Sequence, residues 1–217
     1  MTHAYNELYL DDAMLALGDM LEFAICDCGY DPDYFFSMFI TSGVADKIGC
    51  GNPKYNGGMS GYELVAEVVF LTTGNRPTSP IVTHESHGKE YWAGWIMAYY
   101  QWHSGLTFSD MAKNGLSVSE VMSMYVLHEA DESKFVETAD EIIARHKKEK
   151  PSKLSVIRKA RGFTQQQLAD ASGVALRMVQ LYEQRQNDIG KAQASVVIRL
   201  AKSLGCDVED LVERAFF

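Results

Sequence analysis

Apolar residues recur every three or four positions through most of the chain, the spacing that places them on one face of an α-helix. The first such segment covers residues 5–28, and its apolar face consists of Met14, Leu17, Leu21 and Ala24. Gly29 is expected to end this helix, and Pro32 begins the next, because proline is tolerated in a first helical turn. No segment has a pattern typical of a strand. The spacing therefore predicts an all-α protein, without internal repeats or low-complexity tracts.

The same spacing predicts further helices as far as about residue 150. Two of them begin with a Ser-x-x-Glu capping box, at Ser60 and at Ser117, which satisfies backbone amides of the first turn. The glycine- and proline-containing segments 49–61 and 74–88 are expected to be loops. After the helix at Pro32, the predicted helices span residues 44–48, 60–73, 90–103, 108–112, 117–127 and 132–148. The inner face of the 60–73 helix is expected to consist of Leu64, Val68 and Leu71.

The predicted helix 90–103 is apolar on nearly every side, with the sequence EYWAGWIMAYYQWH. A helix of this kind is usually buried, so we expect it at the centre of the N-terminal domain. Its aromatic residues, Tyr91 to Trp102, are interpreted mainly as core. Two alternatives stay open for them: lining a ligand pocket, or contacting a partner protein, since aromatic side chains are enriched in interfaces.

Residues 163–183, FTQQQLADASGVALRMVQLYE, contain two short amphipathic segments joined by a tight turn. Thr164 is placed to cap the first segment, and Gly173 suits the left-handed backbone of the turn. Val174, Val179 and Tyr182 supply apolar anchors for the second segment. Two helices joined by a short turn that contains glycine form a helix-turn-helix pattern.

The region from about residue 154 to residue 212 resembles the Cro-like (Xre, lambda-repressor-like) helix-turn-helix family. The resemblance implies a five-helix DNA-binding domain. One departure is Ala175, where the family usually has a Ser or Thr that caps the recognition helix. The matching residues are Leu154-Ser155-Val156-Ile157-Arg158, Gly162-Phe163-Thr164-Gln165, Leu168-Ala169, Ser172-Gly173-Val174, Val179-Gln180, Tyr182-Glu183, Leu200-Ala201, Leu204-Gly205-Cys206 and Val208-Glu209-Asp210-Leu211.

The resemblance also implies which residues contact double-stranded DNA. The second helix of the motif enters the major groove by its N-terminal residues, which places near base edges Ala175, Leu176, Arg177, Gln180 and Leu181. Arg177 is suited to guanine and Gln180 to adenine. Contacts to the phosphate backbone are expected from Gln165 and, in the loop that follows the motif, from Arg185, Asn187 and Lys191. Thr164 is also counted among the DNA-binding residues. An alternative is that the module serves only in protein interaction.

Other residues of the motif are expected to be structural rather than to contact DNA. Met178, Val179 and Tyr182 are interpreted as core residues. The family resemblance implies that Glu183 tethers the recognition helix to neighbouring backbone or to an arginine.

Charge divides the chain into an acidic part and a basic part, although its net charge is −9. Residues 1–150 contain 10 Lys and Arg against 22 Asp and Glu, a net charge of −12. Residues 151–202 contain 9 basic and 3 acidic residues, the balance expected of a DNA-binding module. We therefore predict two domains, residues 1–150 and residues 151–217, with the boundary at Pro151-Ser152.

Several other functions are disfavoured. No apolar run is long enough to span a membrane, and the N-terminus does not resemble a signal peptide.

Four scattered cysteines indicate reduced thiols, buried or half-buried, in a bacterial cytoplasm, where the protein would associate with the nucleoid. A zinc site from Cys26, Cys28 and Cys50 with His84 or His87, and a hydrolytic set from Ser86, His87, Glu129 and Asp131, are weak alternatives. The sequence predicts no metal, no cofactor and no enzyme activity.

The N-terminal part resembles a companion domain that precedes Cro-like modules in bacterial genomes. This resemblance implies an antitoxin-type regulator: a sequence-specific repressor, active as a homodimer on operator DNA, whose N-terminal domain binds a toxin protein. The alternative is a ligand-responsive repressor with a small-molecule sensor domain. The stretches that carry the resemblance are Tyr9-Leu10-Asp11-Asp12-Ala13-Met14, Gly51-Asn52-Pro53-Lys54-Tyr55, Tyr91-Trp92-x-Gly94-Trp95, Ala98-Tyr99-Tyr100-Gln101-Trp102 and Leu127-His128-Glu129-Ala130-Asp131.

Overall fold

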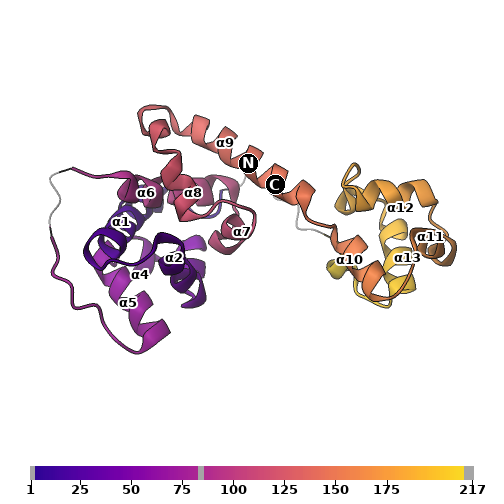
Figure 1. The fold of residues 1–217 in the computed structure, drawn as a ribbon, viewed down its shortest axis with the longest axis horizontal. Coiled ribbons are helices and arrows are strands. Elements are labelled where there is room, and N and C mark those ends of the chain that lie inside the picture. Colours follow the sequence, from indigo (N-terminus) through magenta and orange to yellow (C-terminus); the bar gives the residue numbers. More distant parts are fainter. Residues whose placement is uncertain (1–2, 83–85, 213–217) are drawn as a thin grey trace. The chain divides into compact units, whose positions relative to one another are not determined.

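The computed structural model of the protein describes residues 3–82 and 86–212 (Figure 1). All regular secondary structure within these ranges is helical, so the prediction of an all-α protein is confirmed there. The chain divides into two compact units, of which the first ends at Ile143 and the second begins at Ala144. We call them the N-terminal unit and the C-terminal unit. None of the described helices combines the length and the apolar character needed to cross a membrane.

The N-terminal unit is built from short and medium-length helices that begin and end at recognisable signals. Ser60 and Glu63 form the predicted capping box at the start of one helix, and Asp31 caps another whose first residue is Pro32. The elements are η1 (Glu7–Tyr9), α1 (Leu10–Glu22), η2 (Phe23–Asp27), α2 (Pro32–Thr41), α3 (Val44–Gly49), α4 (Pro53–Asn56), α5 (Gly61–Thr73), α6 (Lys89–Ser104), α7 (Phe108–Lys113), α8 (Val118–Ser123), η3 (Tyr125–Glu129) and the part of α9 (Glu132–Glu149) that precedes Ala144.

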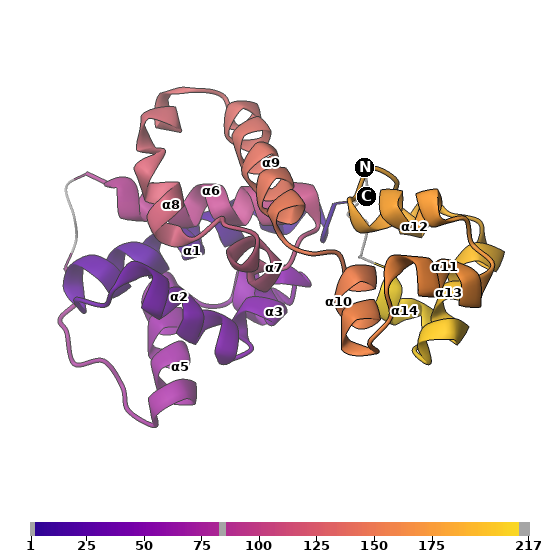
Figure 2. The same cartoon turned by 45° about the vertical axis from the view of Figure 1, so that its right-hand side comes forward.

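The centre of the N-terminal unit is the packing of α1 against α6, which lie side by side in both views (Figures 1 and 2). Two glycines allow this close approach. A Cβ atom on Gly94 would lie 2.1 Å from the backbone oxygen of Leu17, and one on Gly18 would lie 2.7 Å from the ring of Tyr91. The apolar face predicted for the first helix is buried as expected, at Met14, Leu17, Leu21 and Ala24.

The aromatic helix α6 contributes to this core and also reaches the surface. Trp92, Tyr100 and Trp102 are buried. The indole N–H of Trp102 donates a hydrogen bond to the backbone oxygen of Tyr5 over 2.9 Å, and the hydroxyl of Tyr100 donates to Asp140 over 2.5 Å. Tyr91, Trp95 and Tyr99 are half-buried. The prediction that α6 is central is therefore confirmed, and three of its aromatic side chains are only partly covered.

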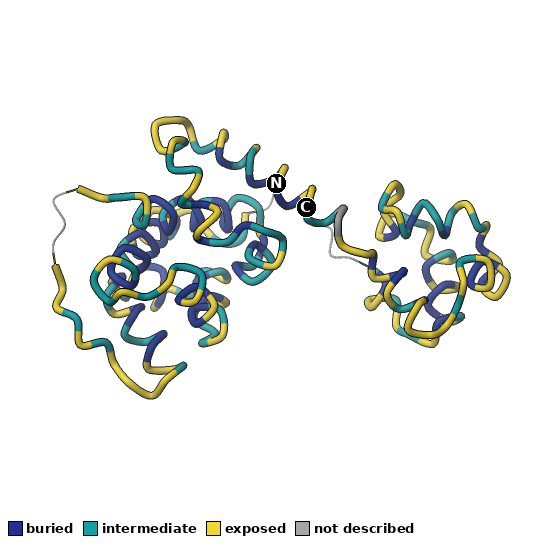
Figure 3. Tube along the Cα trace, in the orientation of Figure 1, coloured by how far each residue is buried: buried dark blue, intermediate teal, exposed yellow. Residues whose placement is uncertain are grey.

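Four details of the N-terminal unit differ from the sequence predictions. The first helix ends in a π-helical turn, Phe23–Asp27, and the expected loop 49–61 contains α4, which Asn52 caps and Pro53 opens. The helix predicted for residues 117–127 stops at Ser123 and continues as the 3-10 turn η3. Leu71, predicted for the inner face of α5, is exposed, whereas Leu64 and Val68 are buried. Figure 3 shows burial along the backbone trace.

The cysteines also differ in part from prediction. Cys28 and Cys206 are half-buried, but Cys26 and Cys50 are exposed, since one lies in the π-helical turn and the other follows the end of α3. Over the described ranges, no group of three or more His, Cys, Asp or Glu side chains is arranged to hold a metal ion. His84, considered above as a zinc ligand, lies outside the described residues.

The C-terminal unit contains the predicted helices of the DNA-binding module, packed around a separate apolar core. Leu154, Leu168, Val179, Leu200 and Leu211 are among the most deeply buried residues of that core. Its elements after α9 are α10 (Lys153–Ala160), α11 (Gln165–Ser172), α12 (Leu176–Glu183), η4 (Ile189–Lys191), α13 (Ala194–Leu204) and α14 (Val208–Leu211).

Candidate nucleic-acid interface

The first helix of the motif, α11, begins with a complete capping box. The hydroxyl of Thr164 accepts a hydrogen bond from the backbone N–H of Gln167 over 3.1 Å. The side-chain oxygen of Gln167 accepts one from the backbone N–H of Thr164 over 2.8 Å. Two amides that a helix start leaves unsatisfied are therefore paired, and the predicted role of Thr164 as the N-cap is confirmed.

The turn between α11 and α12 is stabilised by hydrogen bonds from Ser172 within the turn and from Arg199 in α13. Gly173 has φ = 62°, a left-handed conformation that glycine adopts without the strain of a Cβ atom. The hydroxyl of Ser172 donates to the oxygen of Leu168 and accepts from the N–H of Val174. Arg199, from α13, donates to the oxygen of Gly173 over 3.1 Å. This last contact has no signal in the local sequence.

The recognition helix, α12, has one face in the core and one face exposed. Val179 and Tyr182 are buried, and Met178 packs against the same core, as predicted. Arg177 is exposed and Gln180 is half-buried, so both are accessible at the surface. Ala175 makes no side-chain cap, which leaves the first amides of α12 unpaired by that residue. Exposed amides at a helix start can bind anionic groups such as phosphate.

A buried ion pair fixes α12 to the rest of the C-terminal unit. The guanidinium of Arg158, in α10, contacts both carboxylate oxygens of Glu183, at 2.5 and 3.0 Å. The two side chains are only 9% and 6% exposed. Arg158 also donates to the backbone oxygen of Phe163, and the bond to Glu183 raises the pKa of Arg158 above its ordinary value. The tether expected for Glu183 therefore runs to an arginine of the first helix of the module.

Gln165 joins the same network. Its side-chain N–H donates to Glu183 over 2.7 Å, so Gln165 links the start of α11 to the end of α12. An amide nitrogen carries two N–H groups, and this bond uses one of them. The predicted phosphate contact of Gln165 would therefore come from a side chain that the Glu183 carboxylate has already oriented.

The remaining predicted DNA contacts fall into two groups by exposure. The exposed group contains Thr164, Ala175, Arg177, Asn187 and Lys191, and the half-buried group contains Gln165, Leu176, Gln180, Leu181 and Arg185. Leu176 packs partly against the core. Arg185, at φ = 55°, directs its guanidinium to the backbone oxygen of Pro151 at 3.4 Å. The bond to Pro151 uses one of the five N–H groups of the guanidinium, and the phosphate contact of Arg185 stays a prediction.

The C-terminal unit contains a helix-turn-helix module: the capped helix α11, the left-handed turn at Gly173 and the second helix α12. With Arg177 and Gln180 accessible on α12, it is the module of a DNA-binding transcription regulator. Residues 154–211 match a family model described as helix-turn-helix, so the chain carries a Cro-like helix-turn-helix domain. The match covers the C-terminal unit from α10 to α14. No curated protein and no solved structure matches the chain.

Proposed function

We propose that the protein is an antitoxin-type transcriptional repressor. As a homodimer, its C-terminal unit would bind operator DNA in the bacterial nucleoid, while the N-terminal unit would bind a toxin protein. The observation that supports this division is the separation of charge. Residues 1–150 have a net charge of −12 and residues 151–202 have 9 basic against 3 acidic residues. Acidic side chains repel phosphate but attract a basic protein and increase its association rate.

Co-purification with the product of the neighbouring gene tests the partner. A tagged full-length chain should retain a small basic protein encoded next to it, and co-expression should relieve the toxicity of that protein. The complex should form more slowly as salt is added, because screening weakens long-range attraction. Absence of any complex with the neighbouring product would contradict the antitoxin assignment.

Arg177 is expected to be the main base-reading residue. Arg177→Ala should weaken binding to the specific operator by about 1–3 kcal/mol and relax the preference at one base pair, because one bidentate contact is lost. The measurement is a titration of operator and of single-base variants by fluorescence anisotropy. Lys202→Ala, which removes an exposed charge from the last turn of α13, is the matched control. Unchanged affinity of Arg177→Ala would mean that α12 does not enter the major groove as proposed.

Dimeric binding makes a separate prediction about operator geometry. Half-sites read by two copies should be centred about one helical turn apart, roughly 10–10.5 bp, or a multiple of it. Hydroxyl-radical footprinting should show two protected patches related by a twofold axis. A single asymmetric patch, with no cooperativity in the binding curve, would argue for a monomeric regulator.

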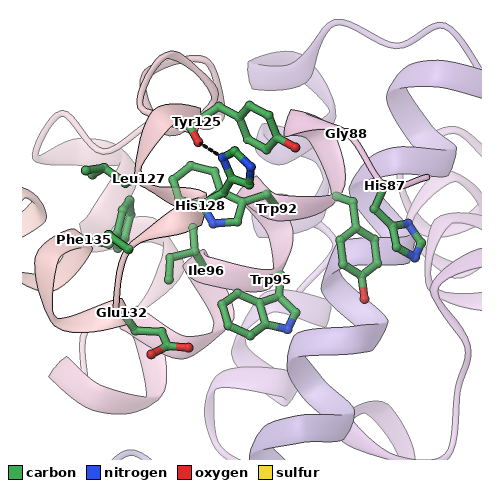
Figure 4. A pocket seen from close by; sticks show the side chains of 12 residues that line it. His87, Gly88, Trp92, Trp95, Ile96, Tyr125, Leu127, His128, Glu132 and Phe135 are labelled. Carbon is green, nitrogen blue, oxygen red and sulfur yellow. Dashed lines mark hydrogen bonds between the residues drawn. The ribbon is translucent and has the colours of Figure 1, made fainter.

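A second candidate function, a ligand-responsive repressor, is favoured by an aromatic pocket in the N-terminal unit (Figure 4). The pocket has a volume of about 270 Å³, close to the lower limit of about 300 Å³ that is usual for ligand sites. Trp92, Trp95 and Tyr125 line it, together with the polar side chains of His87, His128 and Glu132. The Nδ1 of His128 donates a hydrogen bond to the backbone oxygen of Tyr125 over 2.7 Å, which fixes the orientation of the His128 ring.

Intrinsic fluorescence distinguishes this candidate from the first, because two of the three tryptophans line the pocket. A metabolite that both quenches this fluorescence and changes the operator affinity of the isolated chain would support a sensor. Regulation that depends only on the neighbouring protein would support the antitoxin.

A further inference from the structure

The aromatic pocket of Figure 4 has two walls, both within the N-terminal unit. One wall is a face of α6, where Trp92, Trp95 and Ile96 follow one another at positions i, i+3 and i+4. The other wall comes from η3 and the beginning of α9, and it includes Tyr125 and Glu132. Because the pocket encloses about 270 Å³, its occupant must be small.

The rings that line the pocket are fixed at steep angles to one another. The ring of Trp92 makes 73° with that of Tyr125 and 87° with that of Phe135, at centroid distances of 5.8 and 5.7 Å. His128 stacks on Tyr125, with the ring centroids 4.2 Å apart. Parallel rings would suit a flat ligand, whereas rings at steep angles suit a compact, rounded group. The face of an aromatic ring, of tryptophan above all, attracts a cation placed over it.

Glu132 gives the pocket a negative charge that no neighbour neutralises. Its side chain is half-buried, and over residues 3–82 and 86–212 its carboxylate has no ion-pair partner. The described residues that line the pocket include no Lys or Arg. Burial raises the pKa of Tyr99 on α6, and the charges of Glu132 and Asp131 raise it further. A cation in the pocket would therefore be attracted by the rings and by the carboxylate together.

The other polar groups of the pocket do not favour an anion or a metal ion. His87 lies 2.9 Å from the buried carboxylate of Glu22, which compensates any positive charge on its ring. The Nδ1 of His128 is bonded to the backbone oxygen of Tyr125. An anion would meet the charge of Glu132 without a balancing cation. A metal ion would find one carboxylate, since the described residues hold no cluster of three or more ligating side chains.

The class of cation follows from the cost of removing its water. A primary ammonium group is compact and strongly hydrated, so it needs several hydrogen-bond acceptors when it leaves water. The pocket offers one carboxylate among mostly carbon surfaces. A quaternary ammonium group has no N–H groups and spreads its charge over methyl groups, so aromatic faces and a single carboxylate suffice.

We infer that the aromatic pocket binds a small quaternary ammonium compound. Its methyl groups would pack against Trp92, Trp95 and Tyr125, and the carboxylate of Glu132 would balance its charge. The inference rests on the second candidate function, a ligand-responsive repressor, and names the chemical class of the ligand.

Titration of the full-length chain with choline, followed by tryptophan fluorescence, tests the pocket. The matched control is 3,3-dimethylbutan-1-ol, in which carbon replaces the charged nitrogen and the shape is nearly the same. Choline should bind at least about tenfold more tightly, because the alcohol gains nothing from the ring faces or the carboxylate. Ethanolamine, which ends in a hydrated primary ammonium group, should bind more weakly than choline. Equal binding of choline and the alcohol, or tighter binding of ethanolamine, would overturn the inference.

The indole N–H signals of the ¹⁵N-labelled chain locate the binding. Trp92 and Trp95 line the pocket, whereas Trp102 does not and donates to the backbone oxygen of Tyr5 over 2.9 Å. Choline should shift the signals of Trp92 and Trp95 and leave that of Trp102 in place. A shift confined to Trp102, or no shift of any indole signal, would contradict binding in the pocket.

Matched variants separate the charge of the pocket from its packing. Glu132→Gln should weaken choline binding about tenfold, because a half-buried ionic attraction is lost, and leave binding of the neutral alcohol nearly unchanged. Glu141→Gln removes an exposed charge from the same helix at a position that does not line the pocket, and it should change neither affinity. The readout is the ratio of the two affinities, because altered packing changes both. An unchanged ratio in Glu132→Gln, or an equal loss in both variants, would contradict the role assigned to Glu132.

Substitutions of Tyr125 test the ring itself. Tyr125→Phe keeps a ring face and should bind choline within a few-fold of wild type, whereas Tyr125→Leu should weaken choline binding about fivefold more than alcohol binding. Equal losses of both compounds in Tyr125→Leu would mean that the side chain only shapes the pocket.

Operator binding separates failure of this inference from failure of the sensor function. If choline binds as expected but leaves the operator affinity unchanged, the pocket takes quaternary ammonium compounds and the sensor function is wrong. If choline does not bind, while another metabolite quenches the fluorescence and changes the operator affinity, the sensor function stands and the class of ligand inferred here is wrong.

Discussion

Glu183→Ala is expected to lower the free energy of unfolding of the C-terminal unit by about 3–5 kcal/mol. The substitution leaves the buried guanidinium of Arg158 without its carboxylate, and an uncompensated buried charge costs more than the pair itself contributes. Gln165 loses the same partner. Operator affinity should fall as well, because α12 would no longer be tied to α10.

Optical signals can locate this effect within the chain. All three tryptophans, Trp92, Trp95 and Trp102, belong to the N-terminal unit, so their fluorescence follows that unit, whereas circular dichroism follows helices of both. With Glu183→Ala, part of the circular dichroism signal should be lost at lower urea, and the fluorescence transition should stay in place. Glu183→Gln keeps the size and one acceptor, and its loss should be smaller. If Glu183→Ala unfolds like wild type, the ion pair does not contribute to stability.

Gly94→Ala is expected to destabilise the N-terminal unit by about 3 kcal/mol. The added methyl group would lie 2.1 Å from the oxygen and 2.6 Å from the carbon of the Leu17 carbonyl, and 2.9 Å from the nitrogen of Gly18. These are backbone atoms of α1, which cannot rotate away as a side chain would. The two central helices must therefore separate, and their interdigitated core side chains lose contact.

The fluorescence transition should report this change directly, in contrast to the first substitution. It should move to lower urea in Gly94→Ala, while operator binding by the C-terminal unit persists at low denaturant. Gly49→Ala is the matched control, because the nearest atom to its added Cβ, the side-chain nitrogen of Gln101, lies at an ordinary contact distance of 3.4 Å. A similar shift in both variants would mean that the α1–α6 contact is not the sensitive point.

Structure that depends on near neighbours in the chain could be predicted from the sequence. The capping boxes at Ser60 and Thr164 and the left-handed turn at Gly173 depend on residues three or four positions apart. The inward face of α1 follows from helical periodicity alone. The width of a buried face was less predictable: Leu71 fits the periodic pattern of α5 but is exposed. Helical periodicity does not specify which positions the neighbouring helices cover.

The sequence by itself therefore determined the helical class, most helix starts and the helix-turn-helix module, since these depend on neighbours along the chain. The tertiary structure alone decided that Glu183 pairs with Arg158, that Arg199 supports the turn at Gly173, and that Arg185 is directed to Pro151. It also brought Glu132 to the aromatic face of α6 that carries Trp92 and Trp95. Contacts between residues distant in sequence depend on how helices pack, and the periodicity that predicts a helix does not specify its partner.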